Sequence, residues 1–300
     1  MPSCYLNGEV LPLEEARIPV LDRGFIFGDG VYEVIPVFGG RLFRLEEHLK
    51  RLAASLKAVR IPRPLGDEEW TAVLMALVDR NGGGNQSVYL QVTRGVAPRD
   101  LVLAEPVSPT VFAMSNPLTS PREPEPVGAV TCDDIRWRYC HIKAIGLLPN
   151  VLLRLQAADA GAYEAILIRD GHVTEGAASN VFAVHAGVVT TPPKGPELLP
   201  GITRDLIVEL MQAAHLPCHE TLISAEALAS ADEIWLTSSV RELCPVTTLD
   251  GRPVGRGVPG PLWRRALDLY QAYKQRTCRG EVEECVAGAR RGPGSWRWHG

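Results

Sequence analysis

The decisive stretch of the sequence reads Asp134-Ile-Arg-Trp-Arg-Tyr-Cys-His-Ile-Lys143, an apolar and aromatic run that ends in a lysine. A glutamate, Glu175, follows in the segment Val173-Thr-Glu-Gly-Ala-Ala-Ser-Asn180. A lysine amine can form a Schiff base with an aldehyde, and a carboxylate can keep a pyridine nitrogen protonated. An enzyme that holds pyridoxal phosphate can use these two groups, but lysine and glutamate are common residues, so the pair alone proves little. A solvent-facing lysine and an ordinary polar turn residue are the alternative interpretations.

Four further segments accompany this pair in chain order. They read Asp22-Arg-Gly-Phe-Ile-Phe-Gly-Asp-Gly-Val-Tyr-Glu-Val34, Gln91-Val-Thr-Arg-Gly-Val-Ala-Pro-Arg99, Leu199-Pro-Gly-Ile-Thr-Arg-Asp205 and Thr237-Ser-Ser-Val-Arg-Glu-Leu-Cys-Pro-Val246. Together the segments resemble the fold-type IV, or class IV, pyridoxal-phosphate aminotransferases, and they are most similar to bacterial D-amino acid transaminases. The resemblance extends from about Tyr5 to about Tyr273.

The chain pattern predicts two domains of the α+β and α/β kind, as the fold-type IV resemblance also implies. Residues 1–115 form a small N-terminal α+β domain, 116–126 a linker rich in proline and charge, and 127–275 a larger domain of mixed sheet and helices. Residues 276–300 are rich in glycine and arginine and lack periodicity, so we expect a disordered tail.

Apolar spacing places several helices and one tight turn. Helices are expected over 46–59 and 67–80, the second ending at Asn81-Gly-Gly-Gly84. A third helix over 147–161 is expected to pack through Val151, Leu152, Leu155 and Ala158. The sequence Arg169-Asp-Gly-His172 indicates a hairpin just before Glu175.

Bulk composition points to a globular protein that handles small molecules. The chain has 300 residues, 46% of them hydrophobic, and a net charge of −4, which favours neither nucleic acid nor an anionic membrane as a partner. Its seven cysteines are scattered, with no Cys-x-x-Cys pair, so we expect reduced thiols, no metal and a cytoplasmic location. No uncharged apolar run reaches the ~20 residues of a membrane span.

The resemblance assigns the cofactor-binding residues. Lys143 forms the Schiff base and acts as general base and acid in catalysis, while Glu175 pairs with the pyridine nitrogen. Four positions match residues that hold the phosphate, and one matches a leucine beneath the cofactor ring; these are Arg51, Ile202, Thr203 and Ser239 for the phosphate and Leu199 for the ring.

Substrate recognition is where the sequence departs from the family. Tyr32 and Arg99 match the tyrosine and arginine that hold the substrate carboxylate, but Leu101 stands where these enzymes have a histidine. The expected reaction is transamination between a D-amino acid (D-alanine or D-glutamate) and a 2-oxo acid (pyruvate or 2-oxoglutarate), in a homodimer. The alternatives are an L-branched-chain aminotransferase, an aminodeoxychorismate lyase, or a catalytically silent ligand-binding scaffold.

Overall fold

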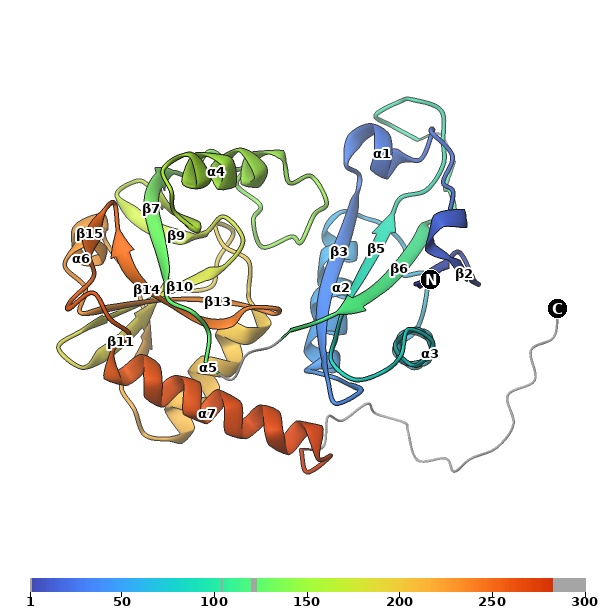
Figure 1. Cartoon of the computed structure of the whole chain (residues 1–300). Helices are drawn as coiled ribbons and strands as arrows, with labels where there is room; N and C mark the ends of the chain where they lie inside the picture. Colours follow the sequence, from blue (N-terminus) through green and yellow to red (C-terminus); the bar gives the residue numbers. More distant parts are fainter. Residues whose placement is uncertain (1, 104, 120–122, 283–300) are drawn as a thin grey trace.

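The computed structural model describes residues 2–103, 105–119 and 123–282. Within these residues the strands form two sheets that lie side by side, each with its own helices (Figure 1). The first sheet contains the strands of the N-terminal part and the second those that follow residue 126. This is the mixed α+β and α/β architecture that the sequence predicts.

The first sheet has six strands in the order β2-β1-β6-β5-β3-β4, and every neighbouring pair is antiparallel. The elements of this half of the chain are β1 (Ser3–Leu6), β2 (Glu9–Pro12), η1 (Leu13–Glu15), α1 (Arg23–Phe27), β3 (Gly30–Phe38), β4 (Arg41–Leu42), α2 (Leu45–Ala58), α3 (Asp67–Arg80), β5 (Gln86–Thr93) and β6 (Thr110–Pro117).

Helices α2 and α3 form where the apolar spacing predicts them. Leu49, Leu52 and Leu56 of α2 are buried at the spacing of one helix face, and Trp70 of α3 is fully buried. Both helices share one hydrophobic core with β3 and β5. Helix α3 ends at Arg80, before a run of three glycines that all have positive φ.

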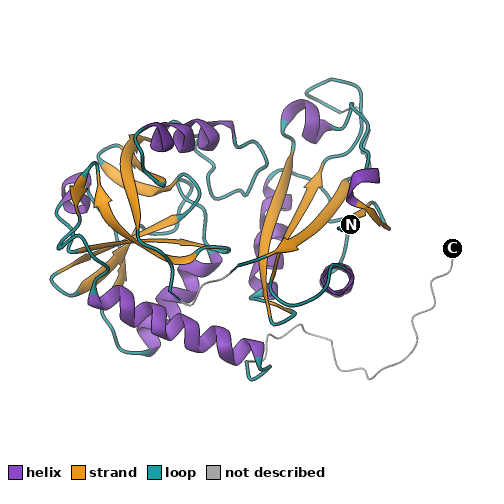
Figure 2. Cartoon of the chain, viewed as in Figure 1, coloured by secondary structure: helices purple, strands orange, loops and turns teal. Residues whose placement is uncertain are grey.

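The second sheet has nine strands, with the path β12-β11-β10-β13-β14-β7-β8-β9 and with β15 paired to β14. The elements of the second half of the chain are β7 (Val127–Asp133), α4 (Leu148–Asp159), β8 (Glu164–Arg169), β9 (His172–Gly176), β10 (Asn180–His185), β11 (Val188–Thr191), α5 (Ile202–Ala213), β12 (Cys218–Glu220), α6 (Ala225–Ala229), β13 (Glu233–Ser238), β14 (Glu242–Leu249), β15 (Arg252–Pro253) and α7 (Pro261–Cys278). Strand β7 is parallel to both neighbours, so the sheet is mixed. Helices α5 and α7 cover one side of the sheet and α4 the other (Figure 2).

The tight turn between β8 and β9 confirms the predicted hairpin. Arg169 pairs with His172 across it, and Asp170 and Gly171 both have positive φ. Two successive positive-φ residues are typical of a type I′ turn, which suits the twist of antiparallel strands. The turn pairs the start of β9 with β8, and the register then shifts by one residue between Val173 and Gly176, the segment that contains Glu175.

Helix α7 differs from the sequence-based expectation. It runs to Cys278, so the first residues of the predicted 276–300 tail are helical, and residues 283–300 of that tail lie outside the described part of the chain. Trp263 and Tyr270 of α7 are fully buried in a core that also contains Phe38 and Phe43 from the first half. The helix therefore packs against both halves of the chain.

The boundary between the halves also differs slightly from the prediction. Strand β6 continues through Pro117, two residues into the segment expected to be a linker, because Asn116 and Pro117 pair with β5. Strand β7 begins at Val127, where the second domain was expected. We propose a division into domains near residues 118–126.

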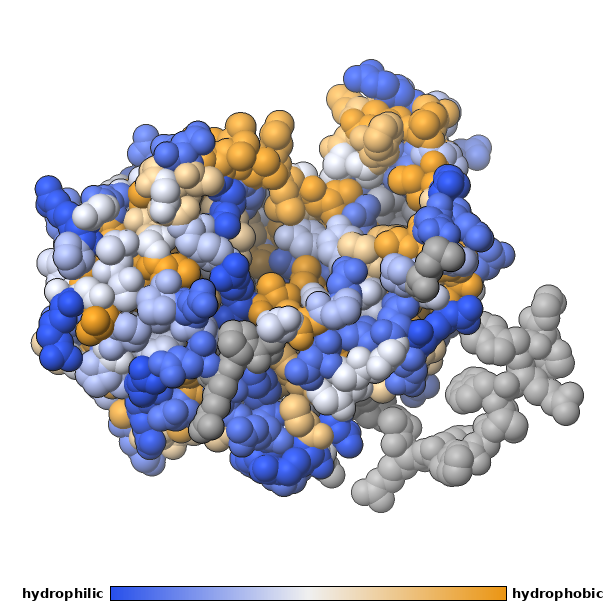
Figure 3. Space-filling model, in the orientation of Figure 1, coloured by the Kyte–Doolittle hydropathy of each residue, from blue (hydrophilic) through white to orange (hydrophobic). Residues whose placement is uncertain are grey.

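Helix α4 contradicts the predicted direction of its apolar stripe. Val151, Leu152 and Leu155 are 50%, 50% and 55% exposed, whereas Leu153 and Ala157 are buried against the sheet. Spacing identifies which residues share a face but not which way that face points. Figure 3 shows the resulting apolar surface over α4.

The described residues contain no helix with the length and apolar character needed to cross a bilayer. The same part of the chain contains no group of three or more His, Cys, Asp or Glu side chains placed to hold a metal ion.

Candidate active site

A cavity of about 750 Å³ is lined by residues of both halves of the chain. From the first half it is lined by Tyr32 of β3 and Arg51 of α2, and from the second half by residues of β9, of the start of α5 and of the segment before α4. The predicted site residues that line it are Tyr32, Arg51, Lys143, Glu175, Leu199, Ile202, Thr203 and Ser239. Arg99 is not among the lining residues.

Lys143 is held in the cavity by the backbone of the first half. Its carbonyl accepts a hydrogen bond from the Tyr32 N–H at 3.0 Å, and its own N–H donates to Ser55 Oγ at 3.2 Å. Its Nζ lies 4.2 Å from the centroid of the Tyr32 ring. Removal from water, with a smaller effect of the Arg51 charge, lowers the pKa of the Lys143 amine to about 8. At pH 7 roughly a tenth of the amine is therefore uncharged and nucleophilic, far more than for an ordinary lysine.

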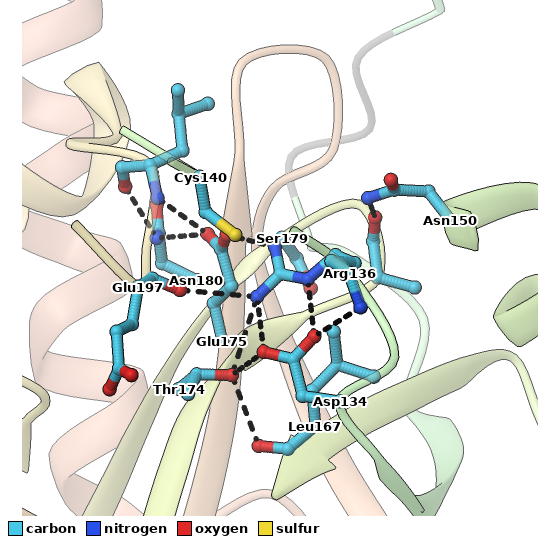
Figure 4. Close-up of polar contacts among 12 residues, drawn as sticks. Asp134, Arg136, Cys140, Asn150, Leu167, Thr174, Glu175, Ser179, Asn180 and Glu197 are labelled. Atoms are coloured by element: carbon cyan, nitrogen blue, oxygen red, sulfur yellow. Dashed lines mark hydrogen bonds and ion pairs between the residues drawn. The ribbon is translucent and has the colours of Figure 1, made fainter. Parts of the chain in front are cut away.

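Glu175 projects into the cavity from β9 and is almost fully buried. Its Oε2 accepts hydrogen bonds from Asn180 Nδ2 and from the Leu199 N–H, each at 3.1 Å, and its Oε1 accepts one from Arg136 Nη1 (Figure 4). Burial raises the pKa of Glu175 to about 7, and the Arg136 charge opposes this rise. Oε1 has a single protein donor and so retains capacity for another.

The first residues of α5 also line the cavity. Its first N–H groups, at Ile202 and Thr203, have no acceptor within the helix, and its N-cap, Gly201, supplies no side-chain bond. Nearby, the buried hydroxyl of Thr237 has no hydrogen-bond partner in the described part of the chain. A helix N-terminus with unpaired donors is a typical site for an anion.

Arg51 brings positive charge to this region. Its Nε and Nη2 donate to the buried carboxylate of Glu33 and its Nη1 donates to the Pro200 carbonyl, all at 2.8 Å. A guanidinium has five N–H groups, so two remain for a ligand. The Pro200 contact places the charge next to the α5 N-terminus.

Asn180 connects the two ends of the cavity. Its Nδ2 donates to Glu175 and also to the Leu199 carbonyl at 2.9 Å. A Cβ at Gly201 would lie only 1.9 Å from Asn180 Oδ1, so this close approach requires glycine. Asn180, Glu33, Thr237 and Arg136 have no predicted role, although all four lie within the motifs quoted above.

The expected carboxylate-binding pair is not assembled within one chain. Tyr32 lies in the cavity, stacked on Tyr89, and burial raises its pKa to about 12, so its hydroxyl remains a neutral donor. Arg99 is exposed, with its guanidinium 5.5 Å from the centroid of the Phe27 ring. Leu101 is 79% exposed.

Comparison with known proteins matches this arrangement to one family. The model of the amino-transferase class IV family matches residues 30–249. A D-alanine aminotransferase from Bacillus licheniformis is 42% identical over 267 residues, which cover 88% of this chain and 94% of that protein. The chain belongs to the class IV aminotransferases.

Solved structures of this family share the fold. A branched-chain amino acid aminotransferase from Escherichia coli aligns with a TM-score of 0.87 at 27% identity, covering 95% of this chain and 97% of that one. The branched-chain enzyme of Thermobaculum terrenum, solved in its PLP-form, aligns with a TM-score of 0.84 at 25% identity, covering 93% of this chain and 94% of that one.

Proposed function

We propose that this enzyme transfers the amino group between a D-amino acid, D-alanine or D-glutamate, and a 2-oxo acid, pyruvate or 2-oxoglutarate. The observation that carries the proposal is the pairing of the Lys143 amine and the Glu175 carboxylate across one cavity. The D-amino acid preference is supported by 42% identity to a D-alanine aminotransferase, against 27% for a branched-chain enzyme of similar fold.

The cofactor is pyridoxal phosphate, and the cavity has groups that fit each part of it. When bound, it supplies an aldehyde that reacts with amines and a ring that withdraws electrons. Lys143 supplies the amine and Glu175 the carboxylate for the ring nitrogen. The phosphate would be held by Ile202, Thr203, Arg51 and Ser239, to which we add the unpartnered hydroxyl of Thr237, and Leu199 would pack against the ring.

Lys143 also has the properties of a proton carrier. With a pKa of about 8, its Nζ can accept a proton from the substrate Cα and return it near neutral pH. The Tyr32 ring and the surrounding protein restrict water at this nitrogen. The structure of the site therefore supports both a nucleophilic and an acid–base role for one amine.

We expect Glu175→Gln to keep the protein folded and able to bind cofactor while turnover falls about ten- to hundred-fold. An amide cannot hold the ring nitrogen protonated, and losing one charge-assisted hydrogen bond costs about 1.5–3 kcal/mol. The measurement is the turnover number at saturating D-alanine, beside cofactor binding followed by absorbance. An unchanged turnover number with full cofactor occupancy would remove Glu175 from this role.

Leu101→His tests the departure from the family pattern. An added imidazole donor should lower the Michaelis constant for D-alanine, by about two- to tenfold if it contributes the ~0.5–1.5 kcal/mol of one hydrogen bond. Leu101→Asn, also polar but shorter, is the control. A Michaelis constant for D-alanine that is unchanged or raised in Leu101→His would show that position 101 does not take part in carboxylate binding.

A homodimer is the assembly we propose, because one chain exposes a large apolar surface beside the cavity. We call it the α4 surface; it consists of Ile135, Trp137, Tyr139, Leu148, Val151, Leu152 and Leu155. Val151 and Leu155 also line the cavity, so the surface reaches its mouth. Exposed apolar patches of this kind mark protein interfaces. Sedimentation velocity at micromolar concentration measures the mass directly, and a monomer there would contradict the proposal.

Arg99 gains a function in such a dimer. It is exposed outside the cavity of its own chain, and it is followed closely in sequence by exposed Leu101 and Val102. We propose that Arg99 of the partner subunit completes each site and binds the substrate carboxylate beside Tyr32. A cytoplasmic location, suggested by the scattered cysteines, remains part of the proposal.

A coupled screen of paired D- and L-amino acids against common 2-oxo acids tests the substrate assignment. We expect the highest kcat/KM with D-alanine or D-glutamate. A preference for L-leucine would support the branched-chain alternative, and release of pyruvate from aminodeoxychorismate would support the lyase. A chain that shows no visible absorbance with pyridoxal phosphate and no turnover would be a silent scaffold.

A further inference from the structure

Behind Glu175 lies a chain of buried charged side chains of alternating sign. It runs from Glu175 through Arg136 and Asp134 to Arg169, and the exposed fraction of each side chain is 7% or less. Asp134 and Arg136 follow β7, Arg169 ends β8 and Glu175 lies in β9. Two positive and two negative charges leave the group neutral, as buried ionic clusters require. Figure 4 shows Glu175, Arg136 and Asp134 with their shared contacts.

Asp134 fixes the plane of the Arg136 guanidinium. Arg136 Nε donates to Asp134 Oδ1 and its Nη2 donates to Oδ2, both at 2.9 Å, which is a two-point contact. Asp134 is held in turn by Arg169 Nη2 at 3.1 Å and by the Thr174 hydroxyl at 2.9 Å. The orientation of the Arg136 guanidinium is therefore fixed by Asp134, which Arg169 and Thr174 hold in place.

The remaining donor of this fixed guanidinium is aimed at Glu175. Arg136 Nη1 contacts Glu175 Oε1, while Oε2 receives only the neutral N–H groups of Asn180 and Leu199. Among the described residues, Arg136 is thus the positively charged group that is hydrogen-bonded to the Glu175 carboxylate. A buried carboxylate without a cation takes up a proton rather than remain charged. A protonated Glu175 could not stabilise a positive charge in the cavity.

We propose that Arg136 is a positioning residue: it holds Glu175 as an oriented carboxylate, and the Asp134–Arg169 pair holds Arg136. The inference deepens the proposed function, because it rests on the assignment of Glu175 to the cofactor's pyridine nitrogen. It concerns a property of the protein alone, the ionisation of Glu175, which can be measured without cofactor.

Other ionisable groups near Glu175 also influence its ionisation. The Lys143 amine lies across the cavity and favours the carboxylate, whereas burial disfavours it. The Cys140 thiol and the Tyr32 hydroxyl also face Glu175, but burial raises the pKa of each, so both are neutral around pH 7. Asp134 is shielded from Glu175 by Arg136. Arg136 is therefore the permanent positive charge that acts on Glu175.

The test follows the titration of Glu175 by NMR in apoprotein labelled with carboxyl-¹³C glutamate, with the Glu175 signal identified by its loss in Glu175→Gln. We expect Arg136→Met to raise the midpoint of Glu175 by about one to three pH units, since a neighbouring opposite charge typically lowers a carboxyl pKa by that amount. Arg136→Lys keeps the charge and should recover part of the shift. Lys274→Met is the control, because it removes a buried cation paired with Glu242 that does not line the cavity.

A midpoint in Arg136→Met within half a pH unit of wild type would overturn the proposal, as would an equal shift in Lys274→Met. If Arg136→Met does not fold, Arg136→Met/Asp134→Asn removes both charges of the pair and should show the same upward shift; its absence would also overturn the proposal. Failure of the proposed function has a different signature: Glu175→Gln would keep full turnover while the titration still responded to Arg136.

Discussion

Lys143→Ala should abolish both transamination and the visible absorbance of the cofactor bound to lysine. Among the described residues that line the cavity, Lys143 is the one lysine, so no other lysine amine can replace it there. Burial lowers the pKa of its amine to about 8, which favours the uncharged and nucleophilic form. The expected loss is complete within detection, because in the proposed function the same nitrogen both binds the cofactor and carries the proton.

The measurement pairs an absorbance spectrum of the purified protein with pyridoxal phosphate and a coupled assay for pyruvate formed from D-alanine. Lys57→Ala is the matched control, because Lys57 is exposed on α2 and does not line the cavity. It should retain both the spectrum and the activity. Activity near wild type in Lys143→Ala would place the reactive amine elsewhere in the chain.

The parts of the site that the sequence predicted are those that depend on short segments. Lys143 could be recognised because it ends one continuous motif, and Glu175 because it lies in a short segment just after the Asp170–Gly171 turn. The α5 N-terminus could be recognised from Pro200-Gly-Ile-Thr203, whose first N–H groups are free in any such helix. In each case the residues that create the feature are neighbours in the chain.

The parts that sequence did not reveal depend on contacts between distant segments. Arg136 lies inside the decisive motif, yet its role depends on Glu175 reaching it from 39 residues away. The apolar stripe of α4 was visible, but its direction is decided by Leu153 and Ala157 packing on β7 and β8. Arg99 was matched to a substrate-binding residue, and only the folded chain shows that it lies outside its own cavity.

Arg99→Ala should raise the Michaelis constant for D-alanine strongly, with a smaller effect on cofactor binding. Removing one partner of a buried charge pair costs about 2–5 kcal/mol, which corresponds to roughly 30-fold to several thousand-fold in kcat/KM. The comparison needs D-alanine and L-leucine kinetics in wild type, Arg99→Ala and Arg17→Ala. Arg17 is a control because it is also an arginine of the first half and does not line the cavity. D-alanine kinetics indifferent to Arg99 would contradict the D-specific assignment.

Mixing inactive subunits shows which chain supplies Arg99. If Arg99 acts in the partner's site, a dimer of one Lys143→Ala and one Arg99→Ala subunit has one complete site, with Lys143 from the second chain and Arg99 from the first. If Arg99 acts within its own chain, every site in that dimer lacks one residue. Refolding the two variants together should therefore restore about a quarter of wild-type activity, because half of the dimers are mixed and each has one working site. Differential tags show whether mixed dimers have formed. If they have formed and no activity is recovered, Arg99 does not act in the partner's cavity.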